Sequence, residues 1–230
     1  MNTVQKNNQD NAIDRPVREA SQPHIALALV LDVSASMQGA SIIALNGAVN
    51  GMISQMQSDP RLRNIVDLSI FLFGTYGRPV IHQGFRAIAD CALINLPAND
   101  RSTYVVEALD RALEVTRVRY GIYDKAGGSY KPWIVLITDG EFHDGADSLG
   151  SLADKLRQRE SRGKHQFFGL GVRGYDRRQM ESLTNDPAHI VDVEAANFRE
   201  FFTWVGRSLR AVSTKDPGAS VTLEPLVFTV

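Results

Sequence analysis

The stretch HIALALVLDVSASMQG, residues 24–39, contains a strand-like run followed at once by three polar side chains. Residues 24–32 are apolar at nearly every position, which is typical of a parallel strand covered on both faces. The run ends at Asp32, and Ser34 and Ser36 follow at every second position. Such polar groups at a sheet edge can be a helix cap, a nucleophile with its orienting residues, or part of a metal site.

Short apolar runs and helical periodicity alternate along the rest of the chain. The patterns predict further strands at residues 64–74, 78–83, 131–140, 165–171 and 189–192, and helices at 41–57, 100–119, 148–161, 176–183 and 197–212. Residues 84–100 fit neither pattern, and residues 120–130 are predicted to form a loop. The alternation predicts an α/β fold: a doubly wound, mostly parallel sheet with helices on both faces and one short antiparallel edge strand at 78–83.

Composition narrows the class of protein. The 230 residues with 43% apolar content fit one large domain at 24–213, with a flexible N-terminal tail at 1–23 and an extended C-terminal tail at 214–230. A net charge of −1 gives no reason to expect nucleic acid or an anionic membrane as partner. The longest apolar run is too short to span a bilayer, the first residues lack a secretory signal, and the single Cys91 allows no internal disulfide. We therefore expect a cytoplasmic protein.

Two predicted strands end on aspartate, LVLD at Asp32 and LITD at Asp139. Ligands of open parallel sheets bind beyond the carboxyl ends of the strands, so we expect these two ends to lie close together. Carboxylates and hydroxyls are hard oxygen ligands that suit Mg²⁺, Mn²⁺ or Ca²⁺. A divalent cation would also remove the repulsion between the two acids.

These residues carry a family resemblance. DVSASM resembles the Asp-x-Ser-x-Ser motif of von Willebrand factor A (VWA) domains, and LITDG resembles their fourth-strand Asp motif. The resemblance covers roughly residues 24–215. KPWIVLITDG, HQFFGLGV and ANFREFFTWVGRSLRAVSTKDPG are similar to the bacterial tellurium-resistance (TerY-like) group.

The resemblance implies a metal-ion-dependent adhesion site, abbreviated MIDAS, built from three loops. Ser34 and Ser36 would bind the metal directly, Thr103 directly or through water, and Asp32 and Asp139 largely through bridging waters. Family members carry a threonine after glycines in the third loop. Here Arg101 and Ser102 precede Thr103, and Ser102 is the alternative ligand.

Other interpretations of the same motifs compete with the metal site. Ser34 and Ser36 could simply cap the following helix. GLGVRG, with Gly169, Gly171 and Gly174, fits a dinucleotide fingerprint, although turn glycines explain it as well. A hydrolase is disfavoured because the Gly-x-Ser-x-Gly elbow is absent.

The resemblance implies a metal-dependent protein-binding module, not an enzyme, in a bacterial stress or tellurium-resistance system. An acidic side chain of a protein partner, such as a phosphatase- or kinase-like protein of that system, would complete the coordination of a divalent cation. Mg²⁺ is expected first, with Mn²⁺ or Ca²⁺ as alternatives. The candidate partner-binding rim contains Ser102, Glu141, His143 and Asp144. The alternative is an enzyme or nucleotide-binding protein that uses the Gly169–Gly174 turn or the metal site for phosphate chemistry.

Overall fold

A mixed sheet forms the centre of the computed structural model, which describes residues 17–18, 21–75, 80–98 and 103–226. Within these residues the strand order is β3-β2-β1-β4-β5-β6, and only β3 runs antiparallel to its neighbour. The strands are β1 (Ile25–Asp32), β2 (Val66–Phe73), β3 (Val80–Ala87), β4 (Trp133–Thr138), β5 (Gln166–Val172) and β6 (Ile190–Val193). The predicted doubly wound fold with one antiparallel edge strand is confirmed.

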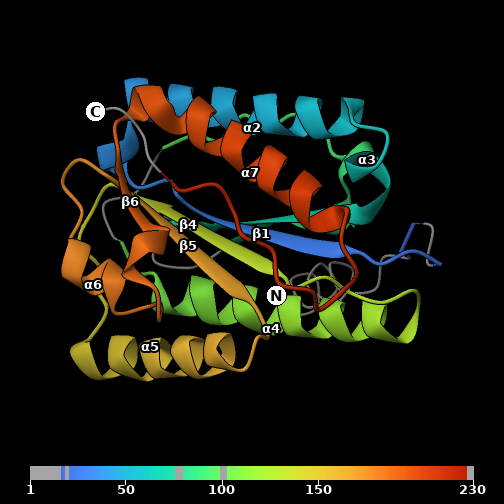
Figure 1. Ribbon diagram of the computed structural model, residues 1–230. Coiled ribbons are helices and arrows are strands. Elements are labelled where there is room, and N and C mark those ends of the chain that lie inside the picture. The colour runs from blue at the N-terminus through green and yellow to red at the C-terminus, as the bar shows by residue number, and fades with distance from the viewer. Residues whose placement is uncertain (1–16, 19–20, 76–79, 99–102, 227–230) are drawn as a thin grey trace, which may run out of the picture.

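Helices cover both faces of the sheet (Figure 1). The α-helices are α2 (Ala40–Ser58), α3 (Leu62–Ile65), α4 (Val106–Lys125), α5 (Ala146–Ser161), α6 (Arg177–Glu181) and α7 (Phe198–Ser213). The short 3-10 helices are η1 (Ala35–Met37), η2 (Ile88–Asp90), η3 (Pro187–His189) and η4 (Ala195–Asn197). Helices α2 and α7 lie on one face, and α4 and α5 on the other. Within the described residues, no helix has the length and apolar character needed to cross a bilayer.

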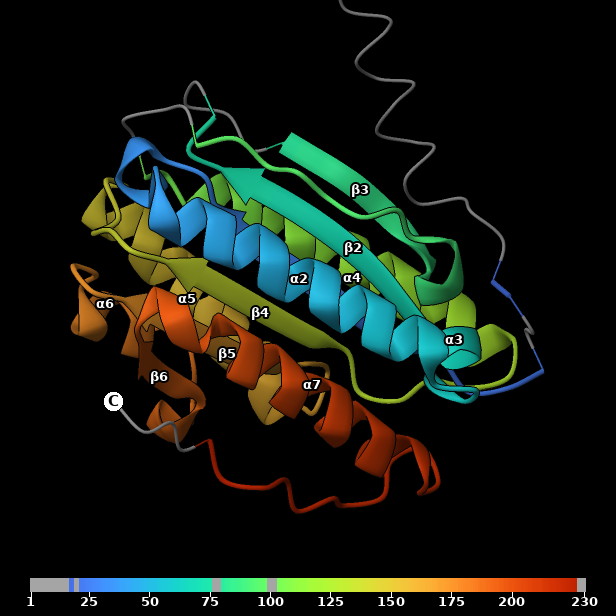
Figure 2. The ribbon, with the colours of Figure 1, turned by 90° about the horizontal axis from the view of Figure 1, so that it is seen from above.

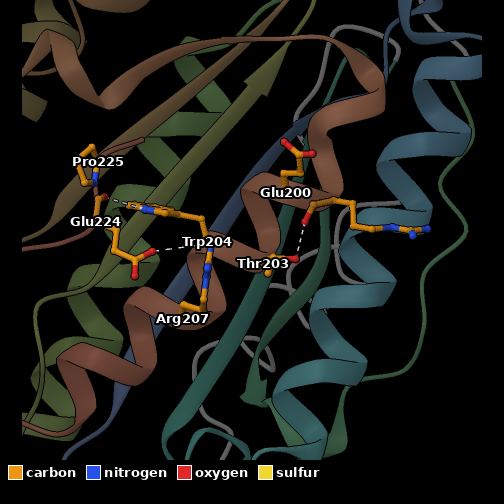
Figure 3. A pocket seen from close by; sticks show the side chains of 7 residues that line it. Glu200, Thr203, Trp204, Arg207, Glu224 and Pro225 are labelled. Carbon is orange, nitrogen blue, oxygen red and sulfur yellow. Dashed lines mark hydrogen bonds and ion pairs between the residues drawn. The ribbon is translucent and has the colours of Figure 1, made fainter. Parts of the chain in front are cut away.

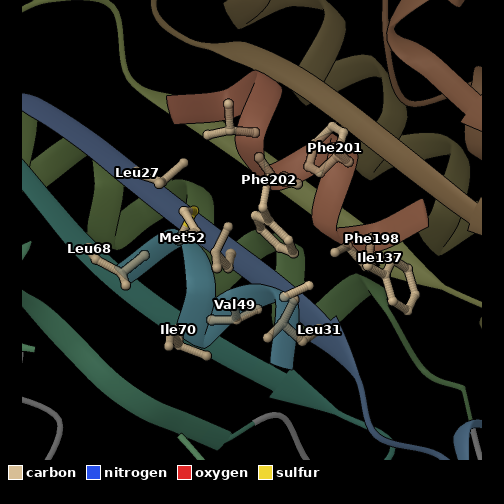
Figure 4. Close-up of a cluster of buried hydrophobic side chains, with 14 of the residues drawn as sticks. Leu27, Leu31, Val49, Met52, Leu68, Ile70, Ile137, Phe198, Phe201 and Phe202 are labelled. Atoms are coloured by element: carbon tan, nitrogen blue, oxygen red, sulfur yellow. The ribbon is translucent and has the colours of Figure 1, made fainter. Parts of the chain in front are cut away.

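Strand β1 is buried along its whole length because both of its faces are covered. Leu27 and Leu31 point into the core beneath α2 and α7, where they meet Phe202 and other large side chains (Figure 4). Ala26 and Ala28 point to the opposite face, beneath α4 and α5. Small side chains there allow α4 to pack closely on the sheet.

The structure corrects the predicted boundaries around α4. The helix occupies Val106–Lys125, whereas the sequence predicted 100–119; Asp100 lies outside the described residues. The predicted loop at 120–130 is therefore helical up to residue 125. Tyr123 and Tyr130, which lie in this segment, are both buried. Their hydroxyl groups donate hydrogen bonds inside the protein, to Asp67 and to the carbonyl oxygen of Ser213.

The segment 91–98, which the sequence left unassigned, runs along α2 and is held there by asparagine side chains. Asn46 exchanges two hydrogen bonds with the backbone of Leu96 (2.9 and 2.8 Å), and Asn50 does the same with Ile94 (2.9 and 2.7 Å). Four residues of helix rise about 6 Å, and two extended residues span nearly the same length. The side-chain amides of Asn46 and Asn50 thus make the backbone hydrogen bonds that a neighbouring strand would otherwise make. They hold in place the segment that leads towards Thr103.

The described part of the C-terminal segment, up to residue 226, is irregular after α7 and packs against the domain. Leu223 and Leu226 are half-buried on the core beneath α7. The indole Nε1 of Trp204 donates to the carbonyl oxygen of Glu224 at 2.9 Å. Figure 2 shows this segment following α7 along the outside of the molecule.

A buried ion pair lies at the opposite end of the sheet from the strand-end aspartates. Asp67, the second residue of β2, accepts hydrogen bonds from Arg119 (2.6 Å) and from the hydroxyl of Tyr123 (2.5 Å). His24 stacks on Tyr123 at 5.2 Å and places its Nδ1 3.8 Å from the Asp67 carboxylate. Burial opposes ionisation of Asp67, but His24, Arg119 and Tyr123 together hold its pKa below the ordinary value.

Replacement of Asp67 by Asn should destabilise the protein by about 3–5 kcal/mol at pH 7, since it leaves the Arg119 charge buried without its counter-charge. The Asp67 carboxylate stabilises the fold fully above its unfolded pKa, about 4, and this contribution is lost as the pH falls through the lower folded-state pKa. Wild type should therefore lose stability below pH 4 more steeply than Asp67→Asn in urea unfolding. Asp154→Asn, in an exposed pair with Arg157, serves as the control with little effect. Equal urea midpoints for wild type and Asp67→Asn would contradict this prediction.

Candidate metal centre

The first loop of the site is shaped by the carboxylate that ends β1. Asp32 is fully buried, and its Oδ1 accepts the backbone N–H of Ser34 at 2.8 Å. Its Oδ2 accepts the hydroxyl of Thr138 at 2.6 Å, which ties the end of β1 to the end of β4. The resulting turn places the hydroxyl oxygens of Ser34 and Ser36 2.9 Å apart.

The second loop meets the first through a serine. The hydroxyl of Ser36 donates to Oδ1 of Asp139 at 2.6 Å. Strands β1 and β4 are neighbours, with Leu31 opposite Ile137, so their final residues reach the same edge of the sheet. The predicted proximity of Asp32, Ser34, Ser36 and Asp139 is therefore present in the structure.

The third loop places Thr103 next to Gly140 of the second loop. Thr103 is buried, and a Cβ placed on Gly140 would lie only 3.2 Å from its Oγ1. Gly140 thus lets the threonine hydroxyl approach the residue after Asp139. The alternative ligand Ser102, together with Arg101, lies outside the described residues.

Ser34 and Ser36 do not act as helix caps. Ser34 occupies the N-cap position of η1 without a side-chain capping bond, and α2 begins after Gly39. Gly74, at the end of β2, has a φ of 78°, and a Cβ there would lie 2.6 Å from the backbone nitrogen of Ser34. Gly74 is a residue of the site that was not predicted from the sequence. The available signal was the glycine that ends the predicted strand 64–74.

The electrostatics of the site leave two acids without a counter-charge. Burial raises the pKa of Asp32, and the charge of Asp139 raises it further against the lowering by Thr138 and Ser34. Burial also raises the pKa of Asp139, although the bond from Ser36 opposes it. Within the described part of the chain, neither carboxylate takes part in an ion pair.

The donor set fits a hard divalent cation. Ser34, Ser36 and Thr103 offer hydroxyl oxygens, and Asp32 and Asp139 offer the negative charge, all without sulfur or imidazole. The described residues contain no cluster of three or more His, Cys, Asp or Glu that could hold a metal by itself. Any cation here would therefore depend on the hydroxyl groups, which would leave it with few directly bound charges.

The sequence profile of the von Willebrand factor type A domain matches residues 26–204. The chain belongs to the VWA domain family. No curated protein matches the sequence significantly.

Several solved structures share the fold of this chain at low sequence identity. Proximal thread matrix protein 1 from the mussel byssus is 14% identical with a TM-score of 0.56, over 83% of this chain and 49% of that chain. The pilus adhesin SpaC from Lactobacillus rhamnosus GG is 14% identical with a TM-score of 0.61, over 84% of this chain and 31% of that one. A von Willebrand factor type A protein from Catenulispora acidiphila is 16% identical with a TM-score of 0.58, over 82% and 43%. The chain thus spans half or less of these proteins' lengths.

The predicted rim residues have different environments in this VWA domain. Glu141 is exposed. His143 accepts the backbone N–H of Thr103 through Nδ1 at 2.9 Å, and Asp144 accepts those of Val105 (2.7 Å) and Val106 (3.2 Å). His143 and Asp144 therefore bind the third loop of their own domain.

The glycines of GLGVRG serve packing in this structure. A Cβ on Gly171 would lie 2.0 Å from the ring of Tyr175, and one on Gly169 would lie 2.7 Å from Ile190. Gly174 has a φ of 114° and passes close to the carbonyl oxygen of Asp139. The Tyr175 ring covers Gly171, and the helix that follows, α6, has only five residues. This arrangement supports the packing interpretation over a cradle for a dinucleotide.

A hollow of about 640 Å³ lies on the outer side of α7 (Figure 3). Its walls come from α7 and the C-terminal segment, and Arg207 and Glu224 form an ion pair of 3.8 Å across it. None of the five candidate metal residues lines it.

Gly140→Ala should weaken Mg²⁺ binding, because the added methyl group would press on Oγ1 of Thr103 and displace it. We expect a loss of roughly 10–100-fold in affinity by isothermal titration calorimetry, the range found when groups around a metal site are disturbed. Gly145→Ala is a matched control, since a Cβ there meets nothing within 4 Å. Equal Mg²⁺ affinities for the two variants would show that Mg²⁺ binding does not depend on the position of Thr103 against Gly140.

Proposed function

We propose that this VWA domain is a metal-dependent protein-binding module and not an enzyme. The observation that carries the proposal is the set of contacts that joins Asp32, Ser34, Ser36 and Asp139, with Thr103 packed against Gly140 in the next loop. Asp32 is buried, Asp139 is half-buried, and neither forms an ion pair within the described residues. Ser34, Ser36 and Thr103 would hold the cation, and Asp32 and Asp139 would supply charge around it. Mg²⁺ is the proposed ion, with Mn²⁺ and Ca²⁺ as alternatives.

Evidence from another VWA domain supports a cation in this place. A structure of proximal thread matrix protein 1 is described as having a zinc-occupied MIDAS motif; it shares 15% identity and a TM-score of 0.51 with this chain. The Asp-x-Ser-x-Ser motif of the present chain supplies oxygen ligands for a cation at the corresponding strand end. A cation bound mainly by neutral hydroxyl groups keeps its attraction for an anion. An acidic side chain of a partner protein is therefore the proposed final ligand.

Apolar side chains beside the metal loops favour a protein as the partner. Ile43, on the first turn of α2, is 71% exposed, and Tyr104, directly after Thr103, is 46% exposed. Both follow loops that carry candidate metal ligands. Exposed aromatic and aliphatic groups around a charged contact are typical of protein interfaces.

The biological setting of the proposal rests on the resemblance to the tellurium-resistance group. We propose a bacterial cytoplasmic stress-response role, with a phosphatase- or kinase-like protein of the same system as partner. Nucleic acid and membrane surfaces are not proposed as partners, since the formal net charge is only −1.

Mg²⁺ should raise the melting temperature of the wild type, because a ligand that binds only the folded state stabilises it. At 100 times Kd the gain is about 2.7 kcal/mol, or roughly 5–10 °C for a domain of this size. Ser36→Ala should lose this shift, since the Ser36 hydroxyl joins Ser34 to Asp139. Ser151→Ala, on the exposed face of α5, is the control. A wild type that no divalent cation stabilises would contradict the proposal.

Ile43→Ser should weaken capture of the partner by immobilised protein while leaving the Mg²⁺-induced melting shift unchanged. Loss of a central apolar contact costs more than 1 kcal/mol, so a fall of at least about fivefold in affinity is expected. Leu93→Ser is the matched control, because Leu93 is also an exposed apolar residue, at 63%. It lies further from the metal loops: its neighbour Ile94 contacts α2 at Asn50, two turns beyond Ile43. The capture should be abolished by chelator for both variants. Equal effects of the two substitutions would contradict the assignment of this surface.

A further inference from the structure

Two adjacent side chains after β4 hold the backbone of the third metal loop. Nδ1 of His143 accepts the N–H of Thr103 at 2.9 Å, and the backbone N–H of His143 donates to the Thr103 carbonyl oxygen at 3.0 Å. Because Nδ1 is the acceptor, the proton of the neutral imidazole lies on Nε2. Both backbone polar groups of Thr103 are thus bound by one residue.

Asp144 accepts the backbone N–H groups at the start of α4, a role that the N-cap residue of a helix usually has. The N-cap position of α4, Val105, has no side-chain capping bond. Oδ2 of Asp144 accepts the N–H of Val105 and Oδ1 that of Val106, from 39 and 38 residues away in sequence. A carboxylate at this helix terminus also interacts favourably with the helix dipole.

These bonds determine where the Thr103 side chain lies. Residues 103, 105 and 106 are bound in succession, and Thr103 stands at the start of this set. Its Oγ1 lies against Gly140, which follows Asp139 in the same loop that carries His143. The second and third metal loops therefore meet in two places. Thr103 packs against Gly140 next to the candidate ligands, and His143 and Asp144 bind the backbone of the third loop.

We propose that His143 and Asp144 are positioning residues for the metal centre: they hold the Thr103 loop against the Asp139 loop so that Thr103 is preorganised for the cation. This inference rests on the proposed metal-dependent function and refines it. It gives His143 and Asp144 a part inside the domain, beside the predicted place of both residues on the partner-binding rim. Their acceptor atoms are used within the domain, whereas the side chain of the nearby Glu141 makes no hydrogen bond to this loop in the described residues.

The substitutions His143→Ala and Asp144→Ala test the inference through Mg²⁺ affinity, measured by calorimetry on the full chain. Each should weaken binding roughly 10–100-fold, as loss of groups that orient metal ligands does. His143→Asn should restore most of the affinity, because its amide oxygen stands at the same branch position as Nδ1 and can accept the Thr103 N–H. Glu141→Gln is the control and should bind Mg²⁺ as the wild type does.

A second measurement separates positioning from general stability. Hydrogen exchange of the Thr103, Val105 and Val106 amides should accelerate in the metal-free alanine variants, while exchange in β1 and β4 stays as in wild type. Variants that melt at lower temperature but keep the wild-type Mg²⁺ affinity would overturn the inference. So would variants that keep both metal affinity and amide protection but fail to capture the partner. A wild type without any cation binding would instead contradict the proposed function itself.

Discussion

The arrangement at the top of the sheet follows from one constraint: two acids, Asp32 and Asp139, end neighbouring strands and lie within one network of hydroxyl contacts. In the described residues neither acid forms an ion pair, and burial raises the pKa of both. Each is compensated only by hydrogen bonds, from Thr138 and the Ser34 backbone in one case and from Ser36 in the other. The site is built so that a cation would complete it.

At the opposite end of the sheet, the protein itself compensates the negative charge of a buried carboxylate. Asp67 is as deeply buried as Asp32, yet its pKa is lowered, because Arg119 and Tyr123 bind its carboxylate directly and His24 lies beside it. Asp67 therefore stabilises the fold through the positive charge of Arg119, which is already present. Asp32 has no such partner in the described residues, and a bound cation would stabilise its ionised form. Perturbed carboxylates of this second kind are typical of functional sites.

The third loop depends on side chains from elsewhere in the chain. Asn46 and Asn50 bind the backbone of residues 94–96 before the loop, and His143 and Asp144 bind residues 103–106 after it. Loops normally cost conformational entropy when they become ordered. For residues 94–96 and 103–106, these hydrogen bonds offset the entropic cost during folding, before any ligand binds.

The sequence by itself determined the order of strands and helices, the buried first strand and the candidate residues at the ends of β1 and β4. These follow from periodicity and from strand-end motifs, which are local in sequence. Only the tertiary structure decided the start of α4, the course of residues 91–98 and the burial of Tyr123. In each case the backbone or side chain is satisfied by a distant partner: Asp144 for α4, Asn46 and Asn50 for the extended segment, and Asp67 for the tyrosine. No local pattern reveals such partners, because they meet only after the sheet has brought their elements together.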